Sequence, residues 1–405
     1  MRLHSIRSGL ALLLAITSYT QADNYQLDLS QGLEFSQKSF NASSDLRLSY
    51  KSVTLSHRTN IFQLDHPFNR YVYQNYDRSN ITMVTEISSI AWQNDWGKIR
   101  AGRDFLKFGP TIYHGPLFSS YSPSLNHVSA SIELPQHIKF DYILVRLDDR
   151  QSDQGVYKRW IYARRLQIDL GNRFSVGLKD FVLASGIQRG IDLNYLNPTA
   201  IYQLEQLHGS VESGSRGANN DNQLMGIDIN YAHNEKNRFY VDFILDEFQI
   251  DLDDRKFLQD SFGFVLGHEY SSADKSRIST EFWLASPWLY TNGGEYTNVE
   301  YNGMSLGLLA PNSYGLTIDL ERKPLHLSYS IYQTGDQTVT SKWNPVNNFI
   351  PLFQKQAIWE HQIDLSVHTA RIPLLQSVRI TYNLLNAHGF HFMATLKPIR
   401  GLYYN

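Results

Sequence analysis

The chain has 405 residues, a formal net charge of −2 and no cysteine. The near-neutral charge gives no electrostatic basis for binding nucleic acid, and the missing cysteines exclude disulfides and thiolate metal sites. A length of this order suits either two or three ordinary domains or one large single-sheet domain.

The N-terminus has the layout of an export signal. Two arginines precede a short apolar run at residues 10–16, and a small-x-small cleavage site ends at Ala22. The apolar run is much shorter than the roughly 20 residues of a membrane-spanning helix. We therefore expect residues 1–22 to be a signal peptide, cleaved near Ala22, and residues 23–405 to form one mature domain.

From residue 25 onward, apolar and polar residues alternate with a period of two, which is typical of β-strands with two different faces. In the segment 223–232, for example, Met225, Ile227 and Ile229 share one face, and Asp228 and Asn230 share the other. The pattern predicts about 18 strands, mostly near the 9–11 residues of a tilted membrane-spanning strand. They lie near 25–36, 45–57, 80–92, 97–103, 127–134, 138–147, 158–170, 173–182, 223–232, 237–246, 258–271, 276–287, 302–309, 313–321, 324–333, 357–370, 374–383 and 388–397.

Short and long connections alternate between these strands. Tight turns are expected at 169–172, 233–237 and 386–389, where Gly and Asn tolerate positive φ. Long connections are expected at 58–79, 104–126, 183–222, 288–301 and 334–356. Together with the 25 tyrosines and 7 tryptophans, this predicts an all-β, transmembrane antiparallel barrel of about 18 strands, with a polar lumen, aromatic girdles and extracellular long loops. Such a barrel belongs in the outer membrane of a Gram-negative bacterium.

The face assignments place charges of both signs in the lumen, among them Arg165, Asp228 and Asp246. We expect these charges to pair across strands, because an unpaired charge in a confined space is costly. Arg164 breaks the pattern, since its neighbours Tyr162 and Leu166 should face lipid. A charge on the lipid face costs roughly 2–4 kcal/mol at the midplane. Arg164 should therefore lie near a rim, or a β-bulge should reset the register there.

Two irregular segments hold the residues most typical of binding. The stretch 104–126 mixes glycine, proline, aromatic and charged residues, a composition that suits sugar rings, although an ordinary loop folded into the barrel has the same composition. The stretch 183–222 should be partly helical, with Pro198 at the first position of a short helix over 199–208. A forty-residue irregular connection in a compact barrel usually has a function, such as plugging the lumen, capping its mouth or binding a ligand.

Catalytic and metal motifs are weak. Residues 213–217 depart from the nucleophile elbow at the first glycine. The acidic run 246–254 reads as a solvated loop, with calcium as the alternative. We expect no catalytic residue, no metal and no cofactor.

An ordered series of motifs resembles the Wzi family of outer-membrane capsule-assembly proteins, over roughly residues 97–290. The series runs through Gly102-Arg103-Asp104 with Lys107, Ala163-Arg164-Arg165, Leu193 to Asn197-Pro198 with Glu205, Asp221-Asn222 to Asp228, and Leu245-Asp246-Glu247-Phe248.

The resemblance implies a barrel of 18 strands that holds exported capsular polysaccharide at the cell surface, like a lectin and without catalysis. In the family, a helical plug closes the periplasmic side and loops close the other. Here the first strand follows the predicted signal almost directly, which leaves little chain for such a plug.

The leading interpretation is thus a barrel that binds surface polysaccharide and helps to attach or assemble capsule or exopolysaccharide. The expected partners are capsular or extracellular polysaccharide, outer-membrane lipid and the barrel-assembly machinery. A porin-like diffusion channel and an outer-membrane lipid hydrolase are the alternatives. The residues chosen for polysaccharide binding, by type and placement, are Tyr113, His114, Asn194, Tyr195 and Arg216.

Overall fold

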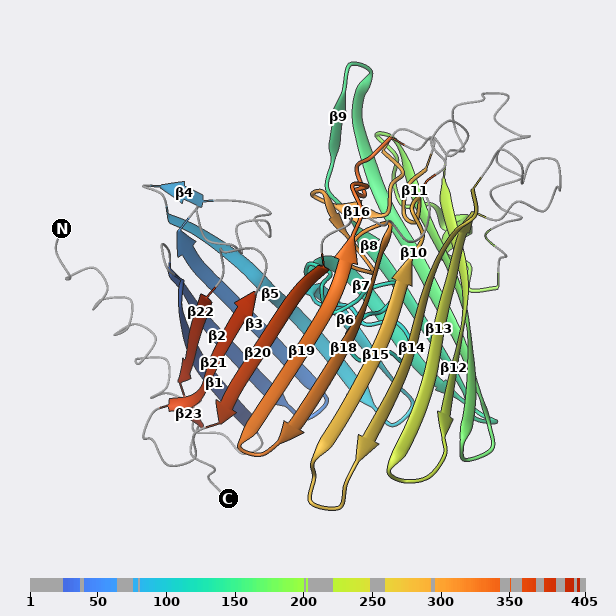
Figure 1. Ribbon diagram of the computed structural model, residues 1–405. Coiled ribbons are helices and arrows are strands. Elements are labelled where there is room, and N and C mark those ends of the chain that lie inside the picture. Colours follow the sequence, from blue (N-terminus) through green and yellow to red (C-terminus); the bar gives the residue numbers. More distant parts are fainter. Residues whose placement is uncertain are drawn as a thin grey trace.

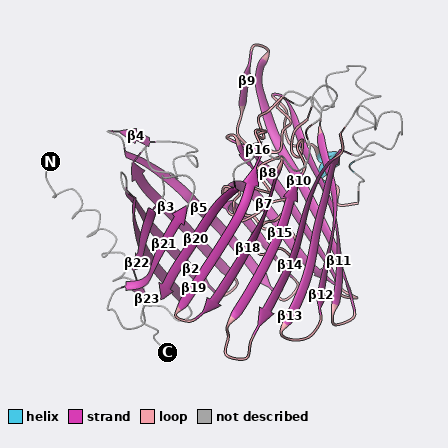
Figure 2. Ribbon diagram, in the orientation of Figure 1, coloured by secondary structure: helices cyan, strands magenta, loops and turns pink. Residues whose placement is uncertain are grey.

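The computed structural model describes residues 25–36, 40–63, 76–78, 81–199, 202, 221–247, 259–292, 296–342, 350, 359–368, 375–383, 390–396 and 399–400. Within these residues the protein is almost entirely β-structure (Figure 2). Tilted strands surround a common lumen (Figure 1). The predicted signal peptide and its cleavage site lie outside the described residues.

One large antiparallel sheet contains every long strand of the described chain. Its long strands are β1 (Tyr25–Ser36), β2 (Phe40–Tyr50), β3 (Val53–Gln63), β5 (Ile81–Asn94), β6 (Gly97–Asp104), β7 (Leu125–Leu134), β8 (Ile138–Arg146), β10 (Gly155–Leu170), β11 (Phe174–Ile187), β12 (Asn222–Ala232), β13 (Asn237–Glu247), β14 (Ser261–Ser271), β15 (Arg277–Ala285), β18 (Ser313–Arg322), β19 (Leu325–Thr334), β20 (Trp359–His368), β21 (Leu375–Asn383) and β22 (Phe390–Leu396). Each pairs with the next in chain order, and β22 also pairs with β1 over Gly32–Ser36.

A few short elements complete the described structure. Three short strands extend the large sheet, and two more pair with each other above it; the helix α2 has four residues. The short strands are β4 (Tyr76–Arg78), β9 (Arg150–Ser152) and β23 (Ile399–Arg400) in the sheet, and β16 (Glu300–Tyr301) with β17 (Met304–Ser305) apart from it. The helix α2 (Leu193–Leu196) lies in the connection after β11.

The predicted fold class is confirmed, but two of the predicted strands are wrong. The segment 45–57 contains the turn at Lys51 and Ser52, which joins β2 to β3, so one predicted strand is in fact parts of two. The segment 302–309 consists of turns and bends apart from the two residues of β17, so it is not a strand of the large sheet. One error adds a strand and the other removes one. The predicted number of strands therefore matches the number of long strands in the large sheet, although the strands are not all the same. Of the predicted helix at 199–208, only Thr199 and Tyr202 lie within the described residues.

The outward face of the sheet carries large apolar side chains that remain exposed. Leu178 is 52% exposed, Leu266 47% and Met225 48%. Such an extended apolar surface would be unstable in water but fits the hydrocarbon region of a bilayer. None of the helices in the described part of the chain is long and apolar enough to cross a membrane.

The two rims of the barrel differ. Short turns such as 95–96, 135–137 and 171–173 lie at one end, which we call the short-turn rim. The other end, the long-loop rim, carries β9, β16 and the connections around them (Figure 1). This arrangement confirms the expected alternation of connection lengths.

The interior departs from the expected polar lumen. Towards the long-loop rim, the inward side chains of β8 to β15 are mainly apolar and fully buried, including Val145, Ile161, Phe181, Leu183 and Trp283. They pack against apolar side chains from connections that fold inward. Polar and charged residues occupy the half of the lumen nearer the short-turn rim, so the prediction of a polar lumen holds for one half only.

Candidate functional site

Residues 105–124, here called the inner segment, cross the lumen from one wall to the other. The segment leaves β6 and reaches Glu281 on β15 and Thr317 on β18. β18 stands nine strands along the ladder from β6, half of the eighteen long strands. This connection returns to β7, the strand next to β6. The topology therefore does not require it to reach the far wall, and its path is set by the contacts that it makes there.

One carboxylate holds the middle of the inner segment. The backbone N–H groups of Ile112, Tyr113 and His114 all donate to Glu281, at 2.5, 3.0 and 2.8 Å. The hydroxyl of Tyr240 donates to the same carboxylate at 2.7 Å. Charge-assisted hydrogen bonds of this kind are about twice as strong as neutral ones. Glu281 thus fixes three consecutive residues of the inner segment against the far wall.

His114 is part of this anchor and is only 2% exposed. Its ring stacks between Tyr121 and Trp283, at centroid distances of 4.9 and 5.1 Å. Its Nε2 lies 2.8 Å from the Thr317 hydroxyl. Burial lowers the pKa of His114 to about 3, so the ring stays neutral near neutral pH. Both faces of the ring are covered, which leaves no open face for a sugar in this packing.

A second connection, residues 286–312, locks onto the inner segment from the long-loop side. The Tyr290 hydroxyl donates to the Pro116 carbonyl at 2.6 Å, and the Phe118 N–H donates to the Leu306 carbonyl at 2.6 Å. Asp246 on β13 accepts the Tyr290 N–H at 2.7 Å. The two connections therefore pack as one unit within the long-loop half of the lumen.

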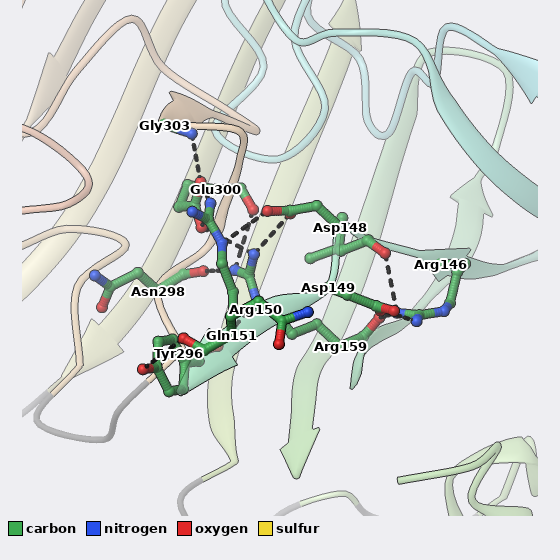
Figure 3. A network of polar contacts seen from close by, with 11 residues as sticks. Arg146, Asp148, Asp149, Arg150, Gln151, Arg159, Tyr296, Asn298, Glu300 and Gly303 are labelled. Atoms are coloured by element: carbon green, nitrogen blue, oxygen red, sulfur yellow. Dashed lines mark hydrogen bonds and ion pairs between the residues drawn. The ribbon is translucent and has the colours of Figure 1, made fainter. Parts of the chain in front are cut away.

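A charged clamp holds this second connection at the long-loop rim (Figure 3). The fully buried guanidinium of Arg159 donates to the carbonyls of Tyr296, Asn298 and Glu300 at 2.9, 2.6 and 3.1 Å. It also pairs with the carboxylates of Glu300 at 2.8 Å and Asp148 at 2.9 Å.

Arg150 bridges the two acids of this clamp. Its guanidinium lies 2.7 Å from Asp148 and 2.7 Å from Glu300. The hairpin that contains β9 is thereby joined to the connection 286–312, and both are joined to the barrel wall.

Below the inner segment, the predicted pairing of lumen charges is confirmed for Arg165 and Asp228. Arg165 and Asp228 form a two-pronged pair at 2.7 and 2.7 Å. Lys179 lies 3.3 Å from Asp228 and 2.5 Å from Asp242. Gly109 of the inner segment sits over this row: a Cβ there would lie 2.5 Å from both Lys179 Nζ and Asp242 Oδ2.

A cavity of about 450 Å³ lies between the inner segment and the short-turn rim. Its roof is formed by residues 105–110 of the inner segment, and its walls come from β6, β7, β8, β10, β11, β12 and β13. Its basic lining residues are Lys98, Arg100, Lys107, Lys139, Arg165 and Arg238, and its acidic lining residue is Asp141.

Arg164 faces outward, as the alternation predicted, but it lies under a cover. The register of β10 with both neighbours is continuous at this position, so the alternative of a β-bulge is wrong. Its guanidinium pairs with Asp180 at 2.6 Å and lies 4.0 Å from the centre of the Tyr202 ring. It also donates to the Pro198 carbonyl at 3.0 Å.

The cover over Arg164 is formed by residues 189–199 and Tyr202, which pack on the outside of the wall. Tyr162 and Tyr202 are fully buried there, although Tyr162 is on the outward face. The Tyr195 hydroxyl donates to Asp221 at 2.9 Å, and the Tyr162 hydroxyl accepts the Asp192 N–H at 2.7 Å.

The residues chosen for polysaccharide binding do not form one site. Tyr113 and His114 lie inside the lumen, whereas Asn194 and Tyr195 lie on the outer wall, with Tyr195 buried and Asn194 exposed. Arg216 and Glu205 lie outside the described residues, as do the side chain of Glu247 and most of the acidic run 246–254. The binding role of these residues stays a prediction.

Most of the remaining motif residues fasten chain segments. Arg103 donates to the Ser124 carbonyl at 3.0 Å. Asp104 pairs with Arg100 at 2.7 Å. Asn222 donates to the Thr297 carbonyl at 3.2 Å. Asn197 accepts the Thr199 N–H at 3.0 Å and so shapes the turn after α2. Lys107 projects into the cavity instead.

Sequence reasoning missed the clamp residue Arg159 and the cavity residue Lys98 as site residues. The alternation contains a signal for both. Arg159 has the same parity as Arg165 on β10, and Lys98 has the same parity as Arg100 on β6, so each inward assignment follows from its neighbour. Nothing in the sequence marks Glu281 as the partner of the inner segment, because its contacts join residues 167 to 169 positions apart.

No protein-family model matches the chain, and no curated protein matches it. Among solved structures it is similar to Wzi, an outer-membrane protein involved in group 1 capsule assembly in Escherichia coli and a carbohydrate-binding β-barrel. That likeness has a TM-score of 0.59 at 13% identity and covers 98% of this chain and 88% of that one.

Two further solved structures are more distant. OpdK of Pseudomonas aeruginosa, solved with vanillate, has a TM-score of 0.49 at 9% identity, and covers 93% of this chain and 98% of its own. OccAB2 of Acinetobacter baumannii has a TM-score of 0.47 at 10% identity, with coverage of 93% and 98%. Identities this low show a shared fold alone: this chain has the fold of outer-membrane β-barrels.

Proposed function

We propose that this protein is an outer-membrane β-barrel that binds surface polysaccharide and helps to attach or assemble capsule or exopolysaccharide, without catalysis. In this proposal the long-loop rim faces the outside of the cell and the short-turn rim faces the periplasm, as is usual for bacterial outer-membrane barrels. The capsule-related role is carried over from Wzi, whose fold the chain shares.

The observation that carries the proposal is the inner segment. A diffusion channel needs a continuous water-filled path, whereas here the inner segment and the connection 286–312 pack into an apolar core across the lumen. In this proposal that core seals the lumen, which suits a protein that holds its ligand on its surface. A sealed lumen is unsuited to free passage of solutes.

The long-loop rim offers a surface for sugar rings beside the charged clamp. The rings of Tyr157 and Tyr296 lie 4.5 Å apart, tilted by 50°, and both side chains are partly exposed. Arg150 and Gln151 of β9 lie next to them (Figure 3). Aromatic faces next to polar groups are what sugar rings bind, since ring C–H groups pack on the aromatic face while hydroxyls find hydrogen-bond partners.

Two measurements test this function together. Purified protein in planar bilayers should give no stable large channels, and it should bind capsular or extracellular polysaccharide from its own cells in a pull-down. The Tyr157→Ala and Tyr296→Ala variants should weaken that binding, whereas Tyr231→Ala, at the short-turn rim, should not. If the unmodified protein binds no polysaccharide and a deletion strain retains its capsule normally, the proposal is refuted.

A porin-like channel is the second candidate, and the cavity near the short-turn rim favours it. That cavity already provides polar, charged walls over part of the path. It becomes a channel only if the inner segment moves, so steady conductance of the unmodified protein would favour this candidate over the first. The lipid hydrolase stays a prediction from the sequence and would require a Ser–His pair at the lipid-facing rim.

A further inference from the structure

The cavity below the inner segment has an excess of positive charge that its own carboxylates do not neutralise. Three of its basic residues have close partners: Arg100 pairs with Asp104, Arg165 with Asp228 and Arg238 with Glu269, at 2.7, 2.7 and 3.0 Å. Lys139 lies 3.8 Å from Asp141. Each of these pairs balances one basic residue with one acid.

Lys98 and Lys107 differ from the other four. Neither makes an ion pair or a side-chain hydrogen bond within the described part of the chain. Lys107 comes from the inner segment, where its side chain is exposed to the cavity, and Lys98 comes from the second position of β6. Burial, and then the nearby guanidinium of Arg238, lower the pKa of Lys107. An anion placed beside it would offset both effects.

The shape of the cavity adds to this charge. A recess with one sign of charge and low-dielectric walls concentrates field lines and attracts ions of the opposite sign. The roof is the packed inner segment, so the recess is blind on the long-loop side. At the other end, Lys98, Lys139 and Arg238 each stand at the second residue of a strand that follows a short turn. A ligand would therefore enter from the short-turn rim.

The neutral part of the lining has the groups that a sugar needs. Ser129, Ser131 and Asn230 supply hydroxyl and amide groups, and Phe105 and Pro110 supply apolar surface. A volume of about 450 Å³ lies within the roughly 300–1,000 Å³ usual for small-ligand pockets. A bare inorganic anion would leave most of this space unfilled.

We propose that this basic recess, called here the vestibule, binds an acidic saccharide that enters from the periplasmic rim, with one carboxylate at Lys98 and a second carboxylate at Lys107. The inference rests on the proposed function and sharpens it, because it names a uronate-containing chain as the ligand class and adds a second contact on the opposite side of the lumen plug. The vestibule holds a chain end or a short segment and does not conduct it, since the roof is closed.

The test uses the full-length protein in lipid nanodiscs, with trigalacturonate as the probe and maltotriose as its uncharged counterpart. Trigalacturonate should bind at least tenfold more tightly than maltotriose, and added salt should weaken it. The double variant Lys98→Gln with Lys107→Gln should lose tenfold or more in affinity for trigalacturonate. Lys236→Gln, an exposed lysine in a short turn of the same rim, should change it less than twofold.

A labelling experiment locates the bound probe independently of affinity. Because the chain has no cysteine, a Ser131→Cys variant carries a single thiol in the vestibule wall. Trigalacturonate should slow its reaction with a cationic thiol reagent at least fivefold. The same probe should leave the thiol of a Glu235→Cys variant, in an exposed turn, unaffected.

The outcomes separate the two proposals. If purified native polysaccharide binds but trigalacturonate neither binds nor protects the Ser131→Cys thiol, the vestibule inference fails and the proposed function stands. If trigalacturonate protects that thiol while the native polysaccharide does not bind, the proposed function fails and the vestibule remains an acidic-saccharide site. Equal protection by citrate at the same concentration would overturn the assignment to a saccharide.

Discussion

Arg164 and Asp180 form an ion pair of 2.6 Å on the outward face of the barrel wall, where they stand opposite each other in the register of β10 and β11. Tyr202 covers the guanidinium at 4.0 Å, and the carbonyl of Pro198 accepts from it at 3.0 Å. The chain therefore keeps this charge away from hydrocarbon by folding a segment over it. Residues 189–199 and Tyr202 thus cover the outer face of β10 and β11 at this position.

Replacing Asp180 should show how much its ion pair with Arg164 contributes to stability. In an Asp180→Asn variant, the mostly buried guanidinium of Arg164 loses its counter-charge, and breaking one half of a buried pair costs about 3–5 kcal/mol. We expect the free energy of unfolding to fall by about 3 kcal/mol, measured by urea titration of the protein refolded into lipid vesicles.

Replacing both partners should restore most of that stability. The double variant Arg164→Leu with Asp180→Val leaves no charge under the cover, so it should lie within about 1 kcal/mol of the unmodified protein. The exposed pair of Glu321 and Arg277, at 2.8 Å on adjacent strands, is the control, and Glu321→Gln should cost less than about 1 kcal/mol. An Asp180→Asn variant as stable as this control would contradict the burial argument.

The carboxylate of Glu281 should decide whether the lumen stays sealed. Glu281→Gln removes the charge that holds the N–H groups of Ile112, Tyr113 and His114, and it places an amide donor near those donors. We expect the inner segment to be held about 2 kcal/mol less tightly. In planar bilayers this should appear as transient channel openings at about 30 times the frequency of the unmodified protein. Glu133→Gln, whose side chain is 59% exposed at the short-turn rim, should behave like the unmodified protein.

The sequence predicts features that depend on neighbouring residues but not those that depend on contacts between residues far apart in the chain. The alternation in β10 placed Trp160 and Leu166 outward and Arg165 inward, because a residue's face follows from local backbone geometry alone. The same rule placed Arg164 outward. What the sequence could not predict is the cover, since it requires knowing that Tyr202 returns across the wall to residues of β10 and β11.

The prediction of a polar lumen is wrong for the half nearer the long-loop rim, for a similar reason. Parity identifies Phe181, Leu183 and Trp283 as positions on one face, but an inward apolar side chain is stable only if another apolar group fills the lumen beside it. That group is the inner segment, whose packing partners lie on β15 and β18. Contacts between residues 167 to 203 positions apart leave no periodic trace in the sequence.

His114 should make the seal weaken in acid. Burial lowers its pKa to about 3 in the packed segment, against about 6.5 for an exposed histidine. The released segment therefore binds the proton more readily between these values. The stability of the packed segment is complete above pH 6.5 and falls by about 1.4 kcal/mol for each pH unit below it. At pH 4.5 the loss should reach about 3 kcal/mol, and channel openings should become frequent in bilayer recordings.

A His114→Phe variant separates this proton from other effects of acid. Phenylalanine keeps a ring between Tyr121 and Trp283 but cannot be protonated. Openings of this variant should change little between pH 7.5 and pH 4.5, even if its baseline is higher because the contact with Thr317 is lost. If both proteins open equally at pH 4.5, then another group controls the seal.

The close approach at Gly109 should tolerate no side chain. An added Cβ would lie 2.5 Å from both Lys179 Nζ and Asp242 Oδ2, and the backbone φ of +114° is strained for any residue with a side chain. Gly109→Ala should destabilise the protein by about 3 kcal/mol, from backbone strain and the displaced ion pair together. Gly190→Ala, where nothing lies within 4 Å, should change stability by less than about 1 kcal/mol. A Gly109→Ala variant as stable as its control would show that the roof of the vestibule is loosely held.

The clamp at Arg159 should control the long-loop rim without affecting the barrel below it. Arg159→Met keeps the length of the side chain but leaves the carboxylates of Asp148 and Glu300 facing each other with only Arg150 between them. It also leaves the carbonyls of Tyr296 and Asn298 without their donor. Breaking a buried charged network costs about 3–5 kcal/mol, which here falls on the connection 286–312. Cleavage at Glu300 by a glutamate-specific protease added to intact cells should become at least tenfold faster.

Lys158→Met is the matched control for this variant, because Lys158 is the neighbouring residue on β10 with a partly exposed side chain. Its cleavage rate should equal that of the unmodified protein. Polysaccharide binding should fall in Arg159→Met alone, because a released Tyr296 no longer lies against Tyr157. If cleavage accelerates while polysaccharide binding is unchanged, the two tyrosines are not the sugar-binding surface, although the clamp still holds the rim. If neither changes, the connection is held by the Tyr290 and Asn222 hydrogen bonds, which join it to the inner segment and to β12.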